Sequence, residues 1–387
     1  MRRPVVIALA LGACGFSVHT NAGGDDAPGD ASGVRDAPTD GPNGPDGMPF
    51  AGPYRRALDV VDARVTGGPH TDFAVYFDTT QDWLRTRANG GLVTRADAND
   101  VWFSLSGSPN AQALAHEVER YTPDTGRYAA WIRVPSLEPS TTLFVHYGDP
   151  TRNVAPAATM VWPGYVGVWH GTNAISDSTG TNTAVAITAV TDGTGKLVDG
   201  RVFDGDQSSI SVGSASAIDD VFAGGATAQA WIRATSWGES GAGRIFSKSE
   251  TAGWVFSTSD GYLAFGNGFT TRDGLWLSSE RVLTLDTWHH VVATYSRTTT
   301  TNVPTFYVDG QPVVVNVSDT PSGNVRSDAP ANLRIGNNDS NTRAFHGTLD
   351  ELRVFDGIRT DAWIATEYAN QNAPSMFFTL GPEQPDL

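Results

Sequence analysis

Cysteine, lysine and long apolar segments are scarce in this sequence. Cys14 is the only cysteine among 387 residues, so no disulfide can stabilise the part of the chain that follows it. Lysine occurs only at Lys196 and Lys248, and the formal net charge of −16 disfavours binding to nucleic acid. The apolar run at residues 4–11 is too short for a membrane span, which needs about 20 residues. These absences exclude a disulfide scaffold and a nucleic-acid partner from the expectations.

The first residues have the layout of an export signal. Arg2 and Arg3 form a basic start, an apolar run follows, and Gly12 and Ala13 are small residues of the kind found at a cleavage site. Cys14 comes directly after them, and this pattern resembles a bacterial lipobox, in which the cysteine is acylated. We expect a lipoprotein signal peptide at residues 1–13, lipidation of Cys14 and a lipid anchor in the cell envelope, at the outer membrane or the cell surface. An ordinary secretory signal is the alternative.

Residues 14–50 are predicted to be a disordered linker. Glycine, aspartate and proline dominate "NAGGDDAPGDASGVRDAPTDGPNGPDGMPF", and almost nothing apolar is available for a core. Thirty such residues have a root-mean-square reach of about 30 Å. The segment would then tether the folded part to a membrane.

The rest of the chain predicts an all-β protein with two β-sandwich domains. In "DFAVYFD", Phe73, Val75 and Phe77 share one face of a strand, while Ala74 and Tyr76 share the other. "TQDWLRTRANGG" predicts a helical turn that ends at two glycines. Together with "YRRALDV", "HEVERYTPDTGRYAAWIRVPSL" and "TTLFVHYGDP", the strand at residues 72–78 makes residues 51–155 resemble the bacterial domain of unknown function 2341. That resemblance implies an extracytoplasmic β domain and no activity.

A second domain is expected at residues 160–383. The blocks "YVGVWHGT", "GRVFDGDQSSISV", "TAQAWIRAT", "WHHVVATYS", "TFYVDGQPV" and "FHGTLDELRVFDG" occur in the order seen in laminin-G-like domains. The resemblance implies the concanavalin A-like lectin and glucanase jelly roll, with two packed antiparallel sheets. The closing "DAWIATEYANQNAPSMFFTLGPEQ" predicts a short helix followed by a final strand.

The neighbouring histidines His289 and His290 are the first residues to weigh as a site. They lie in a predicted strand, where successive side chains point to opposite faces, so they cannot converge on one ion. A structural role is therefore expected for both, and no HExxH spacing occurs in the sequence.

An enzyme is not expected. A retaining glycosidase of this fold needs two carboxyl groups that face one substrate. Asp350 and Glu351 are adjacent in the only comparable strand, so the strand pattern places them on opposite faces. No Gly-x-Ser-x-Gly elbow is present either. A glucanase-type hydrolase is kept as the least favoured alternative.

Calcium is the metal that the resemblance implies, because laminin-G-like jelly rolls often bind it through aspartates and carbonyl oxygens. The candidate ligands are Asp204 in "FDGDQ" and Asp350 in "TLDEL", with Asp177 as a further candidate. Asp204 could instead be a turn residue, and Asp350 could instead pair with an arginine or a backbone amide. Asp309 in "YVDGQPV" is predicted to form a hairpin turn.

The function favoured by the sequence is a binding module for a polysaccharide or a surface protein. A sugar site needs exposed aromatic rings, and Trp237, Trp254, Phe269 and Trp276 lie in or beside glycine-rich connections. Packing in the core is the more common fate of a single tryptophan, so the ligand-binding residues are left open. A structural adhesin or matrix protein without a small ligand is the other reading.

Overall fold

The computed structural model describes residues 53–386 except 173–175, 183 and 330. The predicted signal peptide, Cys14 and the linker up to residue 50 lie outside the described residues. The described part belongs to one compact unit and contains twenty-four strands and a single α-helix. None of its helices has the length and apolarity to cross a membrane. An all-β architecture is confirmed.

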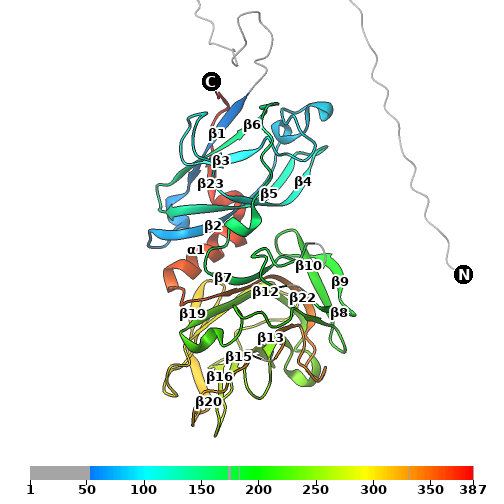
Figure 1. Cartoon of the computed structure of the whole chain (residues 1–387), viewed down its shortest axis with the longest axis vertical. Helices are drawn as coiled ribbons and strands as arrows, with labels where there is room; N and C mark the ends of the chain where they lie inside the picture. The colour runs from blue at the N-terminus through cyan, green and yellow to red at the C-terminus, as the bar shows by residue number, and fades with distance from the viewer. Residues whose placement is uncertain (1–52, 173–175, 183, 330, 387) are drawn as a thin grey trace, which may run out of the picture. The chain divides into compact units, whose positions relative to one another are not determined.

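The first sandwich is formed by two antiparallel sheets near the start of the described chain (Figure 1). One sheet has the order β23-β1-β6-β3, with β24 also paired to β1, and the other has the order β2-β5-β4. Their strands are β1 (Tyr54–Val60), β2 (His70–Thr80), β3 (Trp102–Ser104), β4 (His116–Thr122), β5 (Arg127–Leu137), β6 (Thr142–Tyr147), β23 (Phe378–Leu380) and β24 (Gln384–Pro385). The segment predicted as a helical turn forms the 3-10 turns η2 (Asp82–Leu84) and η3 (Arg87–Asn89), which Gly90 ends with a φ of 83°. Three further 3-10 turns lie next to strands of the first sandwich: η1 (Asp62–Arg64), η4 (Ala158–Met160) and, near the C-terminus, η7 (Pro374–Met376).

Strand β2 shows how the alternating sequence builds two cores. Phe73, Val75 and Phe77 belong to the core between the two sheets of the first sandwich, as predicted from their spacing. Ala74 and Tyr76 point the other way, yet they are also buried, in a second cluster shared with Trp131, Trp162 and Val168. Both faces of β2 are therefore covered at its centre, which explains why residues 73–77 are apolar without interruption.

The second sandwich has two sheets of eight strands each. We call the first the helix-side sheet; its order is β19-β18-β17-β12-β22-β10-β9, and β7 also pairs with β22. Its strands are β7 (Tyr165–Trp169), β9 (Thr191–Thr194), β10 (Asp199–Asp204), β12 (Ala226–Ser236), β17 (His289–Tyr295), β18 (Thr305–Val308), β19 (Gln311–Val313) and β22 (His346–Phe355).

We call the other the groove sheet; its order is β20-β16-β15-β14-β13-β21-β11-β8. Its strands are β8 (Ala186–Thr188), β11 (Ser209–Ser211), β13 (Arg244–Lys248), β14 (Trp254–Ser259), β15 (Tyr262–Asn267), β16 (Gly274–Ser278), β20 (Val315–Asp319) and β21 (Arg334–Ile335). The 3-10 turns η5 (Val221–Ala223) and η6 (Glu239–Gly241) lie in the connections of this sandwich. A large aromatic and aliphatic core fills the space between its two sheets.

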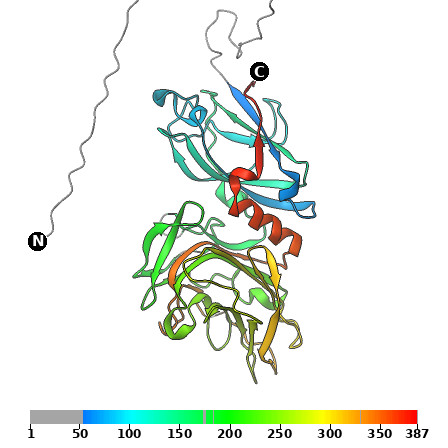
Figure 2. The same ribbon diagram turned by 180° about the vertical axis from the view of Figure 1, so that it is seen from behind.

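The only α-helix of the described residues, α1 (Asp361–Asn372), packs against both sandwiches, and Figures 1 and 2 show it from two sides. Thr360 caps it, since its side chain accepts a hydrogen bond from the Trp363 backbone N–H at 3.2 Å. Trp363 lies in the core of the first sandwich, and the Asn370 amide bonds both backbone groups of Tyr76 in β2. On the adjacent stripe of the helix, Ile364 packs on Val292 of the helix-side sheet. Residues three and four apart share a face of a helix, so two adjacent faces of α1 can pack against the two sandwiches.

The end of the chain returns to the first sandwich. Leu380 pairs with Leu58, and Gln384 pairs with Arg55, so β23 and β24 add to the edge strand β1. The prediction of a helix followed by a strand is confirmed, but the strand does not extend the second domain. The predicted range 160–383 therefore includes β23, although β23 belongs to the first sandwich by its hydrogen bonds to β1. The unpaired backbone groups at the edge of a sheet can bond any extended segment that lies beside them, whatever its place in the sequence.

Candidate functional site

His289 and His290 lie on opposite faces of β17, as the strand pattern predicted. His289 Nδ1 is 2.8 Å from an Asp309 carboxylate oxygen, and its Nε2 accepts a hydrogen bond from the Thr284 backbone N–H at 3.1 Å. His290 is 1% exposed and packs 5.2 Å from the Trp231 ring on the side of the sheet that α1 covers. Asp309 forms the predicted hairpin turn between β18 and β19, with a φ of 52° before Gly310. The histidines therefore fix a turn and a helix interface.

Asp204 and Asp350, the predicted calcium ligands, are not brought together. Asp204 pairs with His346, four residues along β22 from Asp350, which corresponds to about 13 Å. Asp204 accepts hydrogen bonds from the backbone N–H groups of Asp206 and Ser208, as a turn residue does. The two carboxylates cannot hold one ion between them in this geometry, and calcium binding by the protein stays a prediction.

The carboxylate of Asp350 is buried among backbone amides. Its Oδ1 accepts from Gly171 and Glu351, and its Oδ2 accepts from Lys196 and Leu197, at 2.8 to 3.3 Å. Burial and the neighbouring Glu351 raise the pKa of Asp350 to about 7. Asp177 has the same kind of role, because its oxygens accept from the N–H groups of Val168, Thr179 and Asn182. Both aspartates organise loops.

The predicted aromatic platforms are largely core residues. Trp254 and Trp276 are fully buried and Phe269 is 1% exposed, while Trp237 is partly buried against the same core. Glycine-rich surroundings suggested exposure, but glycine next to a large ring also lets the backbone approach it closely. A Cβ on Gly274, for example, would lie 2.3 Å from the Trp276 ring.

A polar hollow crosses the strands of the groove sheet, and we call it the sheet groove. It has a volume of about 240 Å³. The residues that line it are Arg244, Ser249, Glu250, Gly253, Val255, Gly266, Asn267, Gly268, Asp273, Gly274, Leu275 and Asp319. Gly266 keeps the centre of the hollow free of a side chain, because a Cβ there would come within 2.9 Å of Val255. The groove thus combines a nearly flat floor with charged walls.

Each carboxylate of the sheet groove faces an arginine. Glu250 accepts hydrogen bonds from Arg244 at 2.7 and 2.8 Å, and these bonds lower its pKa although its partial burial acts in the opposite direction. Asp319 accepts from Arg272 at 2.5 Å, and Asp273 lies 3.6 Å from the guanidinium of Arg326. The oxygens of these carboxylates can also accept hydrogen bonds from hydroxyl groups.

Asn267 at the end of β15 is the one lining residue with an unused amide. It is 2% exposed, and neither its Oδ1 nor its Nδ2 has a hydrogen-bond partner among the described residues. Asn267 shares a strand face with Leu263 and Phe265 and pairs with Trp254, so its amide lies on the core side of the sheet.

A second group of polar side chains lies where β4 and β5 of the first sandwich meet β7 and β22 of the second. We call Glu117, Glu119, His170, Glu351 and Arg353 the interdomain cluster. Glu351 accepts hydrogen bonds from His170 Nδ1 at 2.7 Å and from Arg353 at 2.5 Å. The Nε2 of His170 lies 3.5 Å from a Glu117 oxygen, and suitable atoms of Glu119, His170 and Glu351 all lie within 4.8 Å of one another.

A β-bulge places Glu351 in this cluster and corrects the expectation from strand alternation. Between Gln229 and Trp231 the pairing of β12 with β22 shifts register, and Glu351 has a φ of 51°. Leu349 and Leu352 both enter the core as a result. The side chains of Asp350 and Glu351 therefore both point away from that core, where they form hydrogen bonds with Gly171 and His170 instead of facing opposite sides of the sheet.

The charges of the interdomain cluster shift one another's pKa strongly. Burial and the nearby charge of Glu351 raise the pKa of Glu119 well above its usual value. Burial would also raise the pKa of Glu117, but the charge of His170 brings it down to about 2. Burial disfavours the charged form of His170, yet Glu351 and Glu117 outweigh it and raise the pKa of the imidazole. Perturbed groups in one place mark a candidate functional site.

Sequence reasoning missed the interdomain cluster, although one local signal was available. Glu117 and Glu119 alternate in "HEVERY", which puts both carboxylates on one face of β4. The remaining members come from sequence positions more than 50 residues later. Only the tertiary structure joins them.

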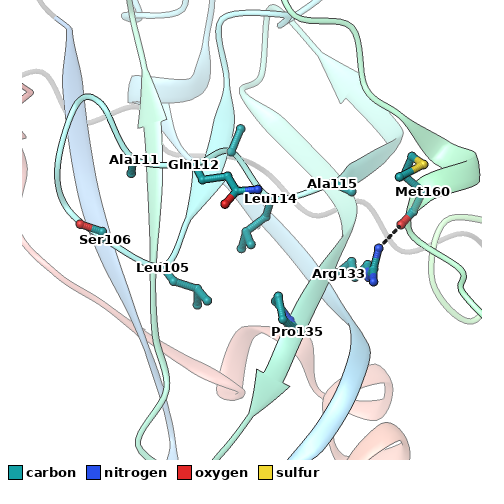
Figure 3. A pocket seen from close by; sticks show the side chains of 10 residues that line it. Leu105, Ser106, Ala111, Gln112, Leu114, Ala115, Arg133, Pro135 and Met160 are labelled. Atoms are coloured by element: carbon teal, nitrogen blue, oxygen red, sulfur yellow. Dashed lines mark hydrogen bonds between the residues drawn. The ribbon is translucent and has the colours of Figure 1, made fainter.

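The first sandwich has a hollow of its own beneath the loop at residues 105–115, with a volume of about 520 Å³ (Figure 3). Leu105, Leu114, Pro135 and Met160 contribute apolar surface to it. Arg133 supplies the single charge of the lining and donates to the Met160 carbonyl at 3.4 Å. This lining offers fewer hydrogen-bonding groups than the sheet groove, so the groove is the better candidate for a polar ligand.

Comparisons with known proteins agree with the fold of the second sandwich. Residues 204–365 match the concanavalin A-like lectin/glucanases superfamily, which confirms that part of the sequence prediction. A search of curated protein sequences finds no match.

Among solved structures, the binding domain of Paraclostridial Mosquitocidal Protein 1 aligns at 15% identity over 53% of this chain and 52% of that one, with a TM-score of 0.43. The ligand-binding domain of botulinum neurotoxin serotype D, in complex with N-acetylneuraminic acid, aligns at 13% identity over 54% and 51%, with a TM-score of 0.41. The chain thus covers about half the length of these toxin domains. Domain 4 of AbnA, a GH43 extracellular arabinanase from Geobacillus stearothermophilus in complex with arabinotriose, aligns at 19% identity over 53% and 98%, with a TM-score of 0.35. Residues 204–365 of this chain form a concanavalin A-like domain.

Proposed function

We propose that this protein is an exported, lipid-anchored surface protein and that its concanavalin A-like domain binds carbohydrate in the sheet groove. The observation that carries the proposal is the polar hollow on the exposed face of a lectin-type sandwich, whose lining includes three carboxylates that each lie beside an arginine. Such groups suit a ligand rich in hydroxyls, which both donates and accepts hydrogen bonds. A volume of about 240 Å³ suits a small polar unit such as one sugar residue.

Binding without hydrolysis is part of the proposal. A glycosidase needs one carboxyl group that carries a proton and can give it to the leaving group. Glu250, Asp273 and Asp319 each lie beside an arginine, and burial of Glu250 is outweighed by the hydrogen bonds from Arg244, which lower its pKa. These carboxylates are better suited to hold hydroxyl groups than to donate a proton. A structural adhesin without a small ligand is the second candidate, and a glycan array distinguishes it from a carbohydrate-binding protein.

The carbohydrate proposal predicts that Asp319→Asn weakens binding to the preferred glycan about tenfold, a loss of about 1.4 kcal/mol. The purified protein would be applied to an array of glycans and cell-wall polysaccharides, with calcium and with a chelator, and the best ligand titrated by calorimetry. Asp339→Asn is the matched control, because Asp339 is also an exposed partner of an arginine in this domain but lies outside the groove. Its affinity should stay within about twofold of the unmodified protein.

The array also separates the alternatives. Absence of binding to any sugar would reject the carbohydrate proposal and favour a protein partner or a structural role. Binding that disappears with the chelator would support a calcium-dependent site, whereas release of shorter sugars would contradict the absence of hydrolysis.

Membrane attachment through Cys14 has its own test. Cells that express the protein would be fed an alkyne fatty acid, and the label and the membrane fraction would be followed. Cys14→Ser should abolish the label and release the protein from the membrane fraction, whereas Ser17→Ala, three residues away, should leave both unchanged. A soluble, unlabelled wild-type protein would contradict the anchor.

A further inference from the structure

We infer that the interdomain cluster is a binding site for one divalent transition-metal cation, with His170 Nε2 and the carboxylates of Glu119 and Glu117 as its ligands. The inference is independent of carbohydrate binding, since it concerns another face of the second sandwich. The glutamates come from β4 of the first sandwich, and His170 directly follows β7 of the second. A cation held by all three would therefore join the two sandwiches.

The first argument is that two buried polar atoms have no hydrogen-bond partner among the described residues. His170 is 6% exposed, and its buried Nε2 has no hydrogen-bond partner among the described residues. The buried Oε1 of Glu119 has none either. The nearest Glu117 oxygen lies 3.5 Å from His170 Nε2, too far for a good hydrogen bond but suitable for two ligands of one ion.

The second argument is the space between these atoms. Glu117, Glu119 and His170 line a cavity of about 180 Å³, together with Thr172, Ser176 and Ser178. This volume exceeds that of one ion, so a hydrated cation fits. Ser178 already donates to Glu117, but the hydroxyl groups of Thr172 and Ser176 can hold the water that would complete the coordination.

The third argument is the support behind the ligands. Glu351 lies outside the cavity lining and accepts a hydrogen bond from His170 Nδ1, so a cation that displaces the second proton of the imidazole would bind at Nε2. The imidazole packs 5.7 Å from the Trp131 ring and 5.6 Å from the Trp162 ring, which fix its plane. A carboxylate behind a histidine that faces a cavity is the usual arrangement of a metal-binding imidazole.

The ligand chemistry narrows the kind of cation. Trp131 donates to the second oxygen of Glu119 at 3.2 Å, while Trp162 and Ser178 donate to the two oxygens of Glu117 at 2.7 and 2.6 Å, and these bonds hold both carboxylates in the cavity lining. One imidazole and two carboxylates suit Zn²⁺, Mn²⁺ or Co²⁺, whereas Ca²⁺ is bound by oxygen ligands. This site is therefore distinct in place and chemistry from the calcium predicted at Asp204 and Asp350.

Metal titration of the full-length protein tests the inference. After treatment with a chelator and its removal, the protein would be titrated with ZnCl₂, MnCl₂ or CoCl₂ by calorimetry, and the Co²⁺ form would be examined by visible absorption. We expect one metal ion per chain, and a Co²⁺ spectrum typical of mixed nitrogen and oxygen ligands. Both His170→Gln and Glu119→Gln should weaken binding at least tenfold.

Two control variants carry the same chemical changes elsewhere. His346→Gln changes a histidine that bonds Ser236 at 2.9 Å, and Glu280→Gln changes an exposed glutamate, so both should bind the metal normally. If His170→Gln does not fold, Glu119→Gln still decides, because it removes the charge while keeping the shape. Absence of binding by the wild-type protein, or unchanged binding by Glu119→Gln and His170→Gln, would overturn the inference.

Discussion

Replacing Arg353 by methionine should lower the free energy of unfolding by about 3–5 kcal/mol. Arg353 is fully buried, and its guanidinium donates to Glu351 at 2.5 Å and to Glu367 of α1 at 2.8 Å. Its Cζ also lies 4.2 Å from the Trp131 ring centroid. Without the cation, Glu367 would remain buried with no positive partner and Glu351 would keep only His170, and that cost is larger than the attraction lost in an exposed pair. Urea denaturation at neutral pH measures the change.

Two further variants separate the buried charge from the loss of side-chain volume. Arg334→Met removes an arginine that bonds the exposed Asp339 at 2.9 Å, and it should cost less than about 1 kcal/mol. Adding Glu367→Gln to Arg353→Met removes one of the stranded charges and should restore part of the stability. A loss below about 1 kcal/mol for Arg353→Met would show that the carboxylates find other partners or lose their charge at little cost.

Local patterns were sufficient to predict the strands, whereas the lectin-type sandwich was implied by the resemblance to laminin-G-like domains. Phe73, Val75 and Phe77 alternate with Ala74 and Tyr76, and each set occupies one face of β2. Such patterns work because the side-chain period of a strand is fixed by its backbone geometry. The hairpin at Asp309 was predictable for the same reason, since a two-residue turn before glycine depends only on neighbouring residues.

Strand alternation failed at Glu351, where it mattered most for the site. The bulge opposite Ala230 inserts one residue in β22, so Asp350 and Glu351 both leave the core that Leu349 and Leu352 enter. Nothing in "TLDELRV" marks this position, because a bulge is stabilised by what its side chains contact after folding. In this protein those contacts are His170 and Arg353.

Neither candidate site could be assembled from the sequence, because each joins distant segments. The residues that line the sheet groove come from β13 to β16, from the loops between these strands and from β20. Its charged residues and glycines form no recognisable sequence motif. The interdomain cluster needs Glu119, His170 and Glu351, which are separated by 51 and 181 residues. The aromatic residues beside glycines were left open by the sequence, and the structure places Trp254 and Trp276 in the core, which is the more common position of a tryptophan.

His290 should make the stability of the protein depend on pH between about 6.5 and 4. Burial lowers its pKa to about 4, while the charges of Glu367 and Asp309 on one side and of Arg353 and Lys196 on the other partly cancel. In this range the unfolded chain binds a proton that the folded chain excludes. The contribution of His290 is therefore complete above pH 6.5 and is lost as the pH falls through this window, by about 3 kcal/mol in total.

His290→Gln replaces the imidazole, which can bind a proton, by an amide that cannot, and keeps a polar side chain between β17 and α1. The wild-type protein should lose about 3 kcal/mol more than the variant between pH 7 and pH 4, measured as free energies of unfolding in urea. Val292→Ala, two positions along the same face of β17, should lower stability by a similar amount at both pH values, because it removes packing against Tyr307 and Ile364 but no proton-binding group. Parallel pH profiles of the wild-type protein and His290→Gln would mean that His290 accepts a proton while buried, and that α1 does not exclude the charge from this interface.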